Sequence, residues 1–326
     1  MSRIVVTGAA GFIGSRLLES LARAHPAADL LAVDHPVPAA KRGNLADAPG
    51  VAFADHHEFL RRLDSGAASP EIIFHLGACS STVEQNWDYL AENNVGYSIR
   101  LWEWCARHRR RLIYASSAAT YGDGSQGFDD AADIRRLQPL NLYGKSKQDF
   151  DLWVQDQKAA GRAGPPQSVG LKFFNVFGPA ESHKGRMASM VFHGWNQIRE
   201  SGAVRLFRSH RPEYADGGQL RDFIYVRDTV NVMHALAEHP EVSGLFNLGT
   251  GRAHSFRELI EALFAALGQP PRIEYIPMPE DLREKYQYFT EATMARLRGA
   301  GVPYQPTPLA DAVADYVNWL RTASAT

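Results

Sequence analysis

The glycine-rich turn near the start of the chain constrains the fold more than any other feature. Gly8, Gly11 and Gly14 follow the first apolar run and lead into an amphipathic stretch over residues 12–24. Glycines here let the backbone approach a pyrophosphate, and the helix start offers unpaired N–H groups. Asp34 ends the second apolar run, 20 residues after Gly14, where a carboxylate can bind a ribose diol. This order predicts a dinucleotide-binding unit.

Short apolar runs alternate with helical periodicity through the rest of the first half. Predicted strands lie at 4–6, 30–33, 51–53, 72–74, 112–114 and 169–174, and further predicted helices lie near 58–64, 86–107 and 143–160. Strands that alternate with helices indicate right-handed crossovers in a parallel sheet. We therefore predict an α/β fold with a doubly wound parallel sheet of the Rossmann type.

The regular alternation of predicted strands and helices ends after about residue 175, where glycine, proline and charged residues interrupt it. Regular elements return at 223–226, 228–238, 246–248, 255–267, 273–276 and 308–322. We predict two parts: residues 1–174 with about 221–242 form the dinucleotide-binding domain, and residues 175–220 with 243–326 form a smaller α/β lobe that binds the substrate.

Composition excludes several kinds of partner. The 35 Lys and Arg residues balance 36 Asp and Glu residues, so no overall field attracts nucleic acid or an anionic membrane. No apolar segment approaches the roughly 20 residues that a membrane span needs, and no signal peptide pattern opens the sequence. Two cysteines, without metal-ligand spacing, fit a reducing compartment. We expect a cytoplasmic protein without a metal, nucleic-acid or membrane partner.

A tyrosine and a lysine four residues apart form the clearest catalytic pattern. Tyr143 and Lys147 open a predicted helix and share one of its faces. A phenol with a pKa near ~10 is a weak base, but a neighbouring ammonium and a nicotinamide cation stabilise its phenolate. Ser117, at the end of a predicted strand, can bind the same substrate oxygen. The three residues predict acid–base chemistry on a secondary alcohol.

The residues leave the choice between NAD and NADP open. Asp34 favours NAD, because a carboxylate repels a 2′-phosphate. Lys41 and Arg42 follow shortly after it and would favour NADP if they reach over that phosphate.

The chain resembles the extended short-chain dehydrogenase/reductase family and, within it, the ADP-L-glycero-D-manno-heptose 6-epimerases. The resemblance runs from residue 4 to about 320. It rests on the segments Gly77–Thr82, Tyr114–Gly122, Phe174–Pro179, His183–Ser189, Phe246–Arg252 and Tyr286–Thr290. The segments around Cys79 and Lys184 discriminate most, since the glycine turn and the Tyr-x-x-x-Lys pattern occur throughout the larger family.

The resemblance implies residue roles and a cofactor. Tyr143 and Lys184 would be two acid–base residues, Ser117 would bind the reacting hydroxyl, and Lys147 would hold the cofactor ribose and tune Tyr143. With the glycine turn, the NADP contacts would be Gly8, Ala10, Gly11, Phe12, Gly14, Asp34, His35, Lys41, His56, Leu76, Gly77, Ala78, Cys79, Ser80, Asn93, Lys147, Val176 and Lys184. The sugar-nucleotide contacts would be Ser80, Ser117, Asn175, Arg186, His193, Phe207, Arg208, Ser209, His210, Arg221 and Tyr286.

The implied reaction is epimerisation at C6 of an ADP-heptose, for lipopolysaccharide inner-core precursor synthesis. The carbon to be inverted carries a hydroxyl and no adjacent carbonyl, so its C–H is too weakly acidic for direct proton abstraction. A tightly bound NADP would first oxidise it to a ketone and then return the hydride to the other face. One catalytic group on each side, Tyr143 and Lys184, would serve both orientations of the ketone. Lys184 alternatively holds the substrate's diphosphate. The resemblance also suggests a homo-oligomer, specifically a pentamer.

The sequence departs from the family pattern at three places. Leu76 replaces a usually acidic residue, Arg186 replaces a small hydroxyl residue, and the stretch from Ser209 to Leu220 is longer than usual. These changes leave a C4-epimerase or a reductase of another nucleotide sugar as alternative enzymes. A non-enzymatic NADP-sensing regulator is a further alternative, although such proteins lack the Tyr/Lys pair.

Overall fold

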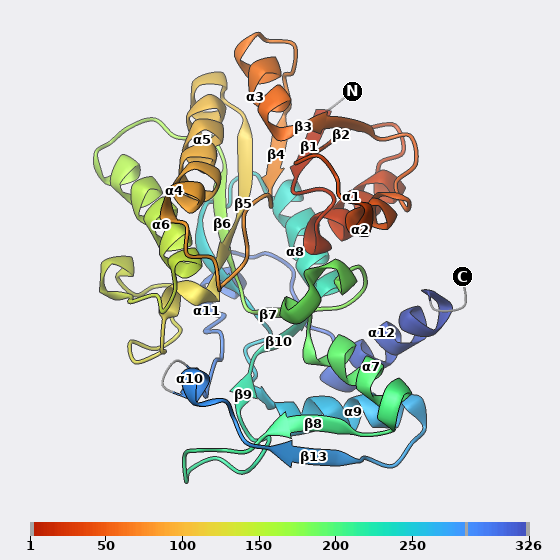
Figure 1. Cartoon of the computed structure of the whole chain (residues 1–326). Coiled ribbons are helices and arrows are strands. Elements are labelled where there is room, and N and C mark those ends of the chain that lie inside the picture. Colours follow the sequence, from red (N-terminus) through yellow and green to blue (C-terminus); the bar gives the residue numbers. More distant parts are fainter. Residues whose placement is uncertain (1–2, 284–285, 324–326) are drawn as a thin grey trace.

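A parallel β-sheet forms the centre of the larger part of the molecule. The computed structural model describes residues 3–283 and 286–323. Within them, seven strands pair in the spatial order β11–β6–β5–β4–β1–β2–β3 (Figure 1). All neighbouring strands run parallel, as for β1 against β2 and β4 against β5. The predicted α/β class with a doubly wound parallel sheet is confirmed.

The strands and helices fall close to the predicted ranges in the first half of the chain. The strands of the large sheet are β1 (Arg3–Thr7), β2 (Asp29–Asp34), β3 (Ala52–Asp55), β4 (Ile72–His75), β5 (Arg111–Ser117), β6 (Ser168–Phe173) and β11 (Gly244–Leu248). The helices associated with them are α1 (Phe12–Ala24), α2 (Ala39–Arg42), α3 (His56–Asp64), α4 (Trp87–Leu90), α5 (Tyr97–His108), α6 (Leu142–Ala159), α8 (Val226–Glu238) and α11 (Ala295–Gly299).

Neighbouring residues along the central strands pack into different layers. Val5 packs with α3, α5 and α6 on one face of the sheet, whereas Val6 packs with α1 and α8 on the other. Ile73 and Phe74 of β4 divide in the same way. Because both faces are covered, these strands are apolar throughout, which explains why periodicity alone could identify them.

The smaller lobe packs around a separate hydrophobic core (Figure 1). Its helices are α7 (Met190–Ser201), α9 (Phe256–Leu267), α10 (Glu280–Arg283) and α12 (Leu309–Ala323). Its short strands form three pairs, β8 (Val204–Phe207) with β13 (Ile273–Ile276), β9 (Leu220–Arg221) with β12 (His254–Ser255), and β7 (Asn175–Phe177) with β10 (Phe223–Tyr225).

Strand β11 and the segment 86–107 differ from the sequence prediction. Strand β11 lies within 243–326, which was assigned to the smaller lobe, yet it pairs with β6 in the large sheet. Its apolar side chains complete the edge of the larger core, so the chain returns to the first domain here. The predicted helix over 86–107 is interrupted by a π-helical segment, Ala91–Gly96, between α4 and α5. No helix among the described residues is long and apolar enough to span a membrane.

Candidate active site

The glycine turn leaves no room for side chains between β1 and α1. Gly8 has a φ of 69°, and a Cβ there would lie 2.6 Å from the Gly77 nitrogen at the end of β4. A Cβ on Gly14 would lie 2.1 Å from the Gly8 carbonyl oxygen. Gly11 precedes α1 without any side-chain cap. The start of α1 therefore presents backbone N–H groups to an approaching anion, as a dinucleotide pyrophosphate requires.

Asp34 lies at the end of β2, beside the glycine turn. One of its carboxylate oxygens accepts a hydrogen bond from Ala10 N at 2.9 Å, and the other accepts one from His35 N at 2.8 Å. The carboxylate is thus held by backbone at the position where the ribose of a dinucleotide would lie.

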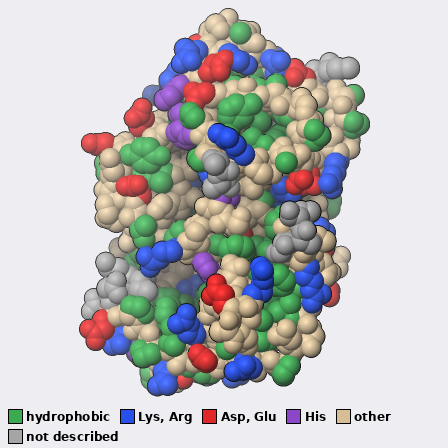
Figure 2. All heavy atoms as spheres, turned by 45° about the vertical axis from the view of Figure 1, so that its right-hand side comes forward, with side chains coloured by type: hydrophobic (Ala, Val, Ile, Leu, Met, Phe, Trp, Pro, Cys, Tyr) green, Lys and Arg blue, Asp and Glu red, His purple; other side chains and the backbone are tan. Residues whose placement is uncertain are grey.

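Imidazole rings gather next to Asp34. The His35 and His56 rings are 3.7 Å apart, and burial, followed by the His56 charge, lowers the pKa of His35. The buried Nε2 of His56 has no hydrogen-bond partner among the described residues. Lys41 lies close enough to lower the pKa of both His35 and His183. The hydrogen-bond donors of His35, His56 and Lys41, together with the glycine turn, fit the adenosine diphosphate half of a dinucleotide. In the space-filling view, histidine side chains lie along a hollow between the two parts of the molecule (Figure 2).

Helix α6 brings Tyr143 against the end of β5. Asn141 caps the helix by accepting a hydrogen bond from Gly144 N at 2.8 Å. Gly144 is needed because a Cβ there would lie 2.7 Å from the Ala119 carbonyl oxygen. Burial raises the pKa of Tyr143, while a side-chain hydrogen bond with Ser117 lowers it. The phenol and the serine hydroxyl therefore lie within hydrogen-bonding reach of each other.

Lys147 lies one helical turn further along α6 and is almost fully buried. Its Nζ donates a hydrogen bond to the Ala115 carbonyl oxygen at 2.8 Å. Burial lowers the pKa of Lys147 to about 8, against the opposing charges of Asp151 and Cys79. The ammonium is therefore the main form at pH 7 but loses its proton about one pH unit above it, which makes its surroundings important.

The loop after β4 is fastened to the same helix by a residue that sequence reasoning missed. Asn94, buried in the π-helical segment, accepts a hydrogen bond from Cys79 N at 2.8 Å and donates to the Cys79 carbonyl oxygen at 2.9 Å. It also donates to Ser146 Oγ at 2.9 Å. The predicted neighbour, Asn93, instead donates to the Tyr89 carbonyl oxygen. The π-helix turns Asn94 inward, and helical spacing alone gives no sign of this.

Lys184 lies on a different loop, close to the glycine turn. Its Nζ lies 5.2 Å from the centre of the Phe12 ring, and burial lowers its pKa while Glu181 raises it. Glu181 is fully buried and accepts hydrogen bonds from Gly178 N, Ser189 N and Ser189 Oγ. The loop that carries Lys184 is thus fixed by an internal carboxylate.

Thr82 and Asn44 connect the loop that carries Lys184 to the Cys79 loop and to the glycine turn. Thr82, after the Cys79 loop, donates to Met187 Sδ at 3.8 Å. Asn44 donates to the carbonyl oxygens of Ala10 and Ala180 at 3.0 and 3.4 Å and contacts His183 Nδ1 at 3.1 Å. Sequence reasoning identified neither Asn44 nor Glu181. Together these contacts place the Tyr143 cluster, the glycine turn and the Lys184 loop around one region.

A small cavity of about 170 Å³ lies in the smaller lobe. Phe207 and Tyr286, both predicted substrate contacts, line it together with Phe256. The guanidinium of Arg221 lies 5.3 Å from the Tyr286 ring and 5.7 Å from the Phe256 ring. Burial lowers the pKa of Arg221, and its described hydrogen bond is to its neighbour's carbonyl oxygen. The aromatic rings of Phe207, Tyr286 and Phe256 could stack on a nucleotide base, and the buried guanidinium of Arg221 could pair with the diphosphate joined to it.

Several other predicted contacts also make hydrogen bonds within the protein. Arg208 Nε donates to the Tyr275 carbonyl oxygen, Ser209 N donates to Asp216, and His210 N donates to the Tyr288 hydroxyl. Asn175 Oδ1 accepts a hydrogen bond from Thr290, and Arg186 is exposed. Five further predicted residues differ in exposure. Ser80 is exposed, and the other four are partly buried: Leu76, Ala78, Val176 and His193.

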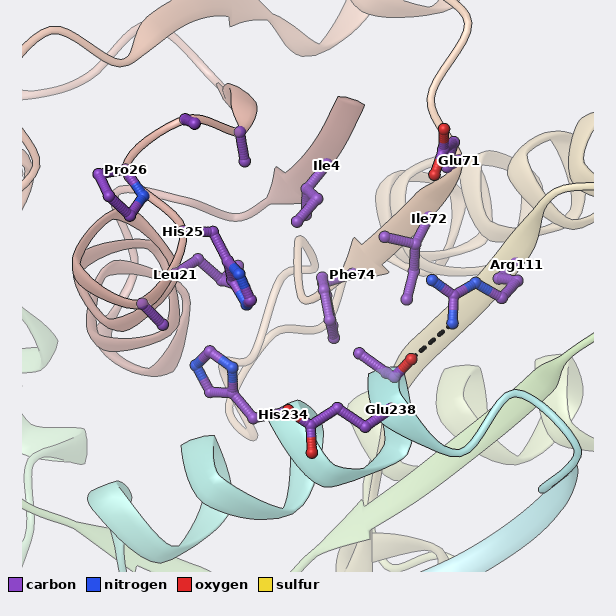
Figure 3. A pocket seen from close by; sticks show the side chains of 14 residues that line it. Ile4, Leu21, His25, Pro26, Glu71, Ile72, Phe74, Arg111, His234 and Glu238 are labelled. Carbon is purple, nitrogen blue, oxygen red and sulfur yellow. Dashed lines mark hydrogen bonds between the residues drawn. The ribbon is translucent and has the colours of Figure 1, made fainter. Parts of the chain in front are cut away.

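A larger hollow of about 570 Å³ lies elsewhere, at the amino ends of the strands (Figure 3). Ile4, Leu21 and Phe74 line it, and the His25 and His234 side chains lie on one side of it. It contains none of the predicted site residues.

Comparison with known proteins decides the family. Residues 4–249 match the NAD dependent epimerase/dehydratase family. The chain belongs to this family. The predicted membership and the nicotinamide dependence of its chemistry are thereby confirmed.

Several relatives are similar over almost their whole length. An ADP-L-glycero-D-manno-heptose-6-epimerase of Nitratidesulfovibrio vulgaris (strain DP4) is 49% identical over 323 residues, or 98% of each chain. The protein of that name from Fusobacterium nucleatum is 43% identical over 325 residues, or 96% of each chain.

Two solved structures show the same architecture. The Helicobacter pylori ADP-L-glycero-D-manno-heptose-6-epimerase is 27% identical, with a TM-score of 0.80 over 98% of this chain and 96% of that one. The Thermus thermophilus UDP-glucose 4-epimerase, in complex with NAD, is 26% identical, with a TM-score of 0.77 over 98% and 99% of the two chains.

Proposed function

We propose that the protein inverts C6 of an ADP-heptose, converting ADP-D-glycero- to ADP-L-glycero-D-manno-heptose by transient oxidation and re-reduction. The observation that carries the chemistry is the Tyr143 phenol, which forms a hydrogen bond with Ser117 at the end of β5. The names of relatives at 43 and 49% identity support the sugar. The place of this product in lipopolysaccharide inner-core precursor synthesis stays a prediction.

The chain's own residues supply proton transfer and positioning. Ser117 holds the reacting oxygen, and Tyr143, as the phenolate that the Lys147 ammonium stabilises, takes the hydroxyl proton as the C–H bond breaks. The glycine turn, Asp34 and Lys147 would hold a nicotinamide dinucleotide, which would supply a hydride acceptor and the return of that hydride to the opposite face of the ketone. Lys184, on the opposing loop, donates a proton to the carbonyl oxygen when the ketone presents its other face. Arg221, with Phe207 and Tyr286, holds the nucleotide so that only the heptose moves.

The direct test is incubation of the purified protein with ADP-D-glycero-D-manno-heptose, followed by NMR at C6. We expect conversion to the L-glycero epimer by the wild-type protein and none by Tyr143→Phe. UDP-glucose is the control substrate, because a C4-epimerase would invert it instead. An unchanged heptose spectrum with folded, cofactor-loaded protein would overturn the proposal, and binding of NADP without turnover of any sugar would favour a regulator.

We infer that the cofactor is NADP rather than NAD. Both oxygens of Asp34 already accept backbone hydrogen bonds, and Lys41 with the His35 and His56 rings supplies donors beside it. A 2′-phosphate would pair with these groups. Denaturing the protein as purified should release NADP, and Lys41→Ala should weaken affinity for NADP far more than for NAD. Release of NAD alone would reverse the assignment.

The homo-oligomer, and specifically the pentamer, rests on the family resemblance. Light scattering of the purified protein tests it, and a mass of one chain of 36.1 kDa would exclude it.

A further inference from the structure

A buried carboxylate lies behind the catalytic residues and has no role in the chemistry described so far. Asp151 follows Tyr143 and Lys147 at intervals of four residues, so the three share one face of α6. Asp151 is 2% exposed, and Lys172, on strand β6, is 1% exposed. Burying ionised groups is costly unless they are compensated, so a cluster of two lysines and one carboxylate requires an explanation.

The cluster supports both sides of Ser117. Ser116 Oγ donates a hydrogen bond to Asp151 Oδ2 at 2.6 Å. On the other side, Lys172 Nζ donates to Thr120 Oγ1 at 2.8 Å, and this hydroxyl donates to the Ser117 carbonyl oxygen at 2.8 Å. Asp151 therefore holds the residue before Ser117, and Lys172 holds the Ser117 carbonyl group through Thr120.

We propose that Asp151 is a positioning residue of the active site, which fixes the end of β5 through Ser116 and supplies the buried negative charge that keeps Lys147 protonated. This proposal rests on the proposed function, because it assigns Lys147 a charged role in the reaction. Opposite charges within a dry region stabilise each other strongly, so removing the carboxylate alone leaves the ammonium uncompensated.

Other ionisable groups face the same cluster. Tyr143 and Tyr121 lie near Asp151, and Tyr114 forms a hydrogen bond with it. Burial raises the pKa of Asp151, and the charges of Lys172 and Lys147 together with the hydrogen bonds from Ser116 and Tyr114 oppose this rise. His75, on β4, and Cys79, on the following loop, lie near Lys147. Burial lowers the pKa of His75 to about 3, so this ring is neutral at working pH and cannot replace the carboxylate.

The test uses Asp151→Asn, which keeps the shape and removes the charge. We expect the alkaline limb of the kcat profile, set by loss of the Lys147 proton, to move down by about one pH unit or more. Asp149→Asn is the matched control, since Asp149 is partly exposed on the same helix and pairs with Lys145. Its profile should coincide with that of the wild type. Unchanged limbs in folded Asp151→Asn protein would overturn the proposal.

Two additional measurements keep the test decisive. If Asp151→Asn does not fold, Ser116→Ala, which removes the hydrogen bond between the end of β5 and the carboxylate, should lower kcat several-fold without moving the alkaline limb down, because the carboxylate keeps its charge. A kcat equal to that of the wild type in Ser116→Ala would then contradict the positioning role of Asp151. Titration of the Lys147 Cε resonance by NMR, without substrate, separates this proposal from the proposed function. A lower midpoint in Asp151→Asn supports the role of Asp151 even if the heptose is not the substrate.

Discussion

The two ends of the large sheet hold very different spaces. At the amino ends of the strands lies a hollow of about 570 Å³ with mainly apolar walls, and its ionisable groups, including Glu71 and Glu238, stand toward its edges (Figure 3). At the carboxyl ends, Asp34, Ser117 and Lys147 are held by specific hydrogen bonds. Converging ionisable groups with hydrogen-bond partners, rather than the amount of empty space, therefore mark the candidate site.

The largest effect is expected from Tyr143→Phe. It removes only the hydroxyl that exchanges a proton with the substrate, so turnover should fall by about 10³-fold or more. Cofactor content, measured after denaturation, should remain at the wild-type level, because the glycine turn and Asp34 are untouched. Substantial epimerisation by this variant would remove the reason for placing the chemistry at the carboxyl ends.

Lys184→Ala should have the next largest effect on catalysis. Its ammonium serves one of the two orientations of the ketone, so kcat should fall by about 10²-fold with cofactor retained. A lysine that only holds the substrate's diphosphate would instead raise KM at nearly constant kcat. Measuring both constants separates the two roles.

The free energy of unfolding of the protein should depend on pH through His75, which lies at the carboxyl end of β4. This ring contacts Thr7 Oγ1 and Ser98 Oγ, and burial lowers its pKa from 6.5 to about 3. Because the folded-state pKa is the lower one, the stabilisation is complete above pH 6.5 and is lost as the pH falls toward 3. The free energy of unfolding should therefore decrease by about 1.4 kcal/mol per pH unit in this window.

Denaturant unfolding at several pH values measures this slope, with His75→Gln as the comparison. The variant should be less stable near neutral pH and show a shallower slope below pH 6.5. Equal slopes in the two proteins would assign the acid sensitivity to other groups.

The smallest effect is expected in the hollow of Figure 3. Ala237→Leu places apolar atoms on its wall, and we expect unchanged kcat and KM with a stability change of about 1 kcal/mol or less. The matched substitution Ala118→Leu, next to Ser117, should reduce turnover strongly. A loss of activity in Ala237→Leu would contradict the assignment of the chemistry to the carboxyl ends of the strands alone.

Local patterns predicted the parts of the site whose spacing is short in sequence. The glycine turn and the Tyr143–Lys147 pair each lie on one strand–helix junction or one helix, so the sequence order carries their geometry. The two-sided burial of the sheet likewise made its strands readable as apolar runs.

Residues that act across long separations could not be predicted. Asn44, Asn94 and Glu181 fasten loops through contacts that depend on the tertiary fold, and a polar residue in a helix normally indicates an exposed face. Arg208 and Ser209 make hydrogen bonds within their own lobe that the sequence pattern did not indicate, and their predicted contact with substrate stays a prediction. Helix α7 and strand β8 were missed because the surrounding region is rich in glycine and charged residues.

The return of hydride within one active site is the central claim. The most direct test supplies ADP-D-glycero-D-manno-heptose carrying deuterium at C6 to the enzyme in ordinary water and examines the product by NMR and mass spectrometry. We predict that the inverted carbon keeps its deuterium through the full turnover. Replacement of that deuterium by hydrogen from the solvent would contradict the account.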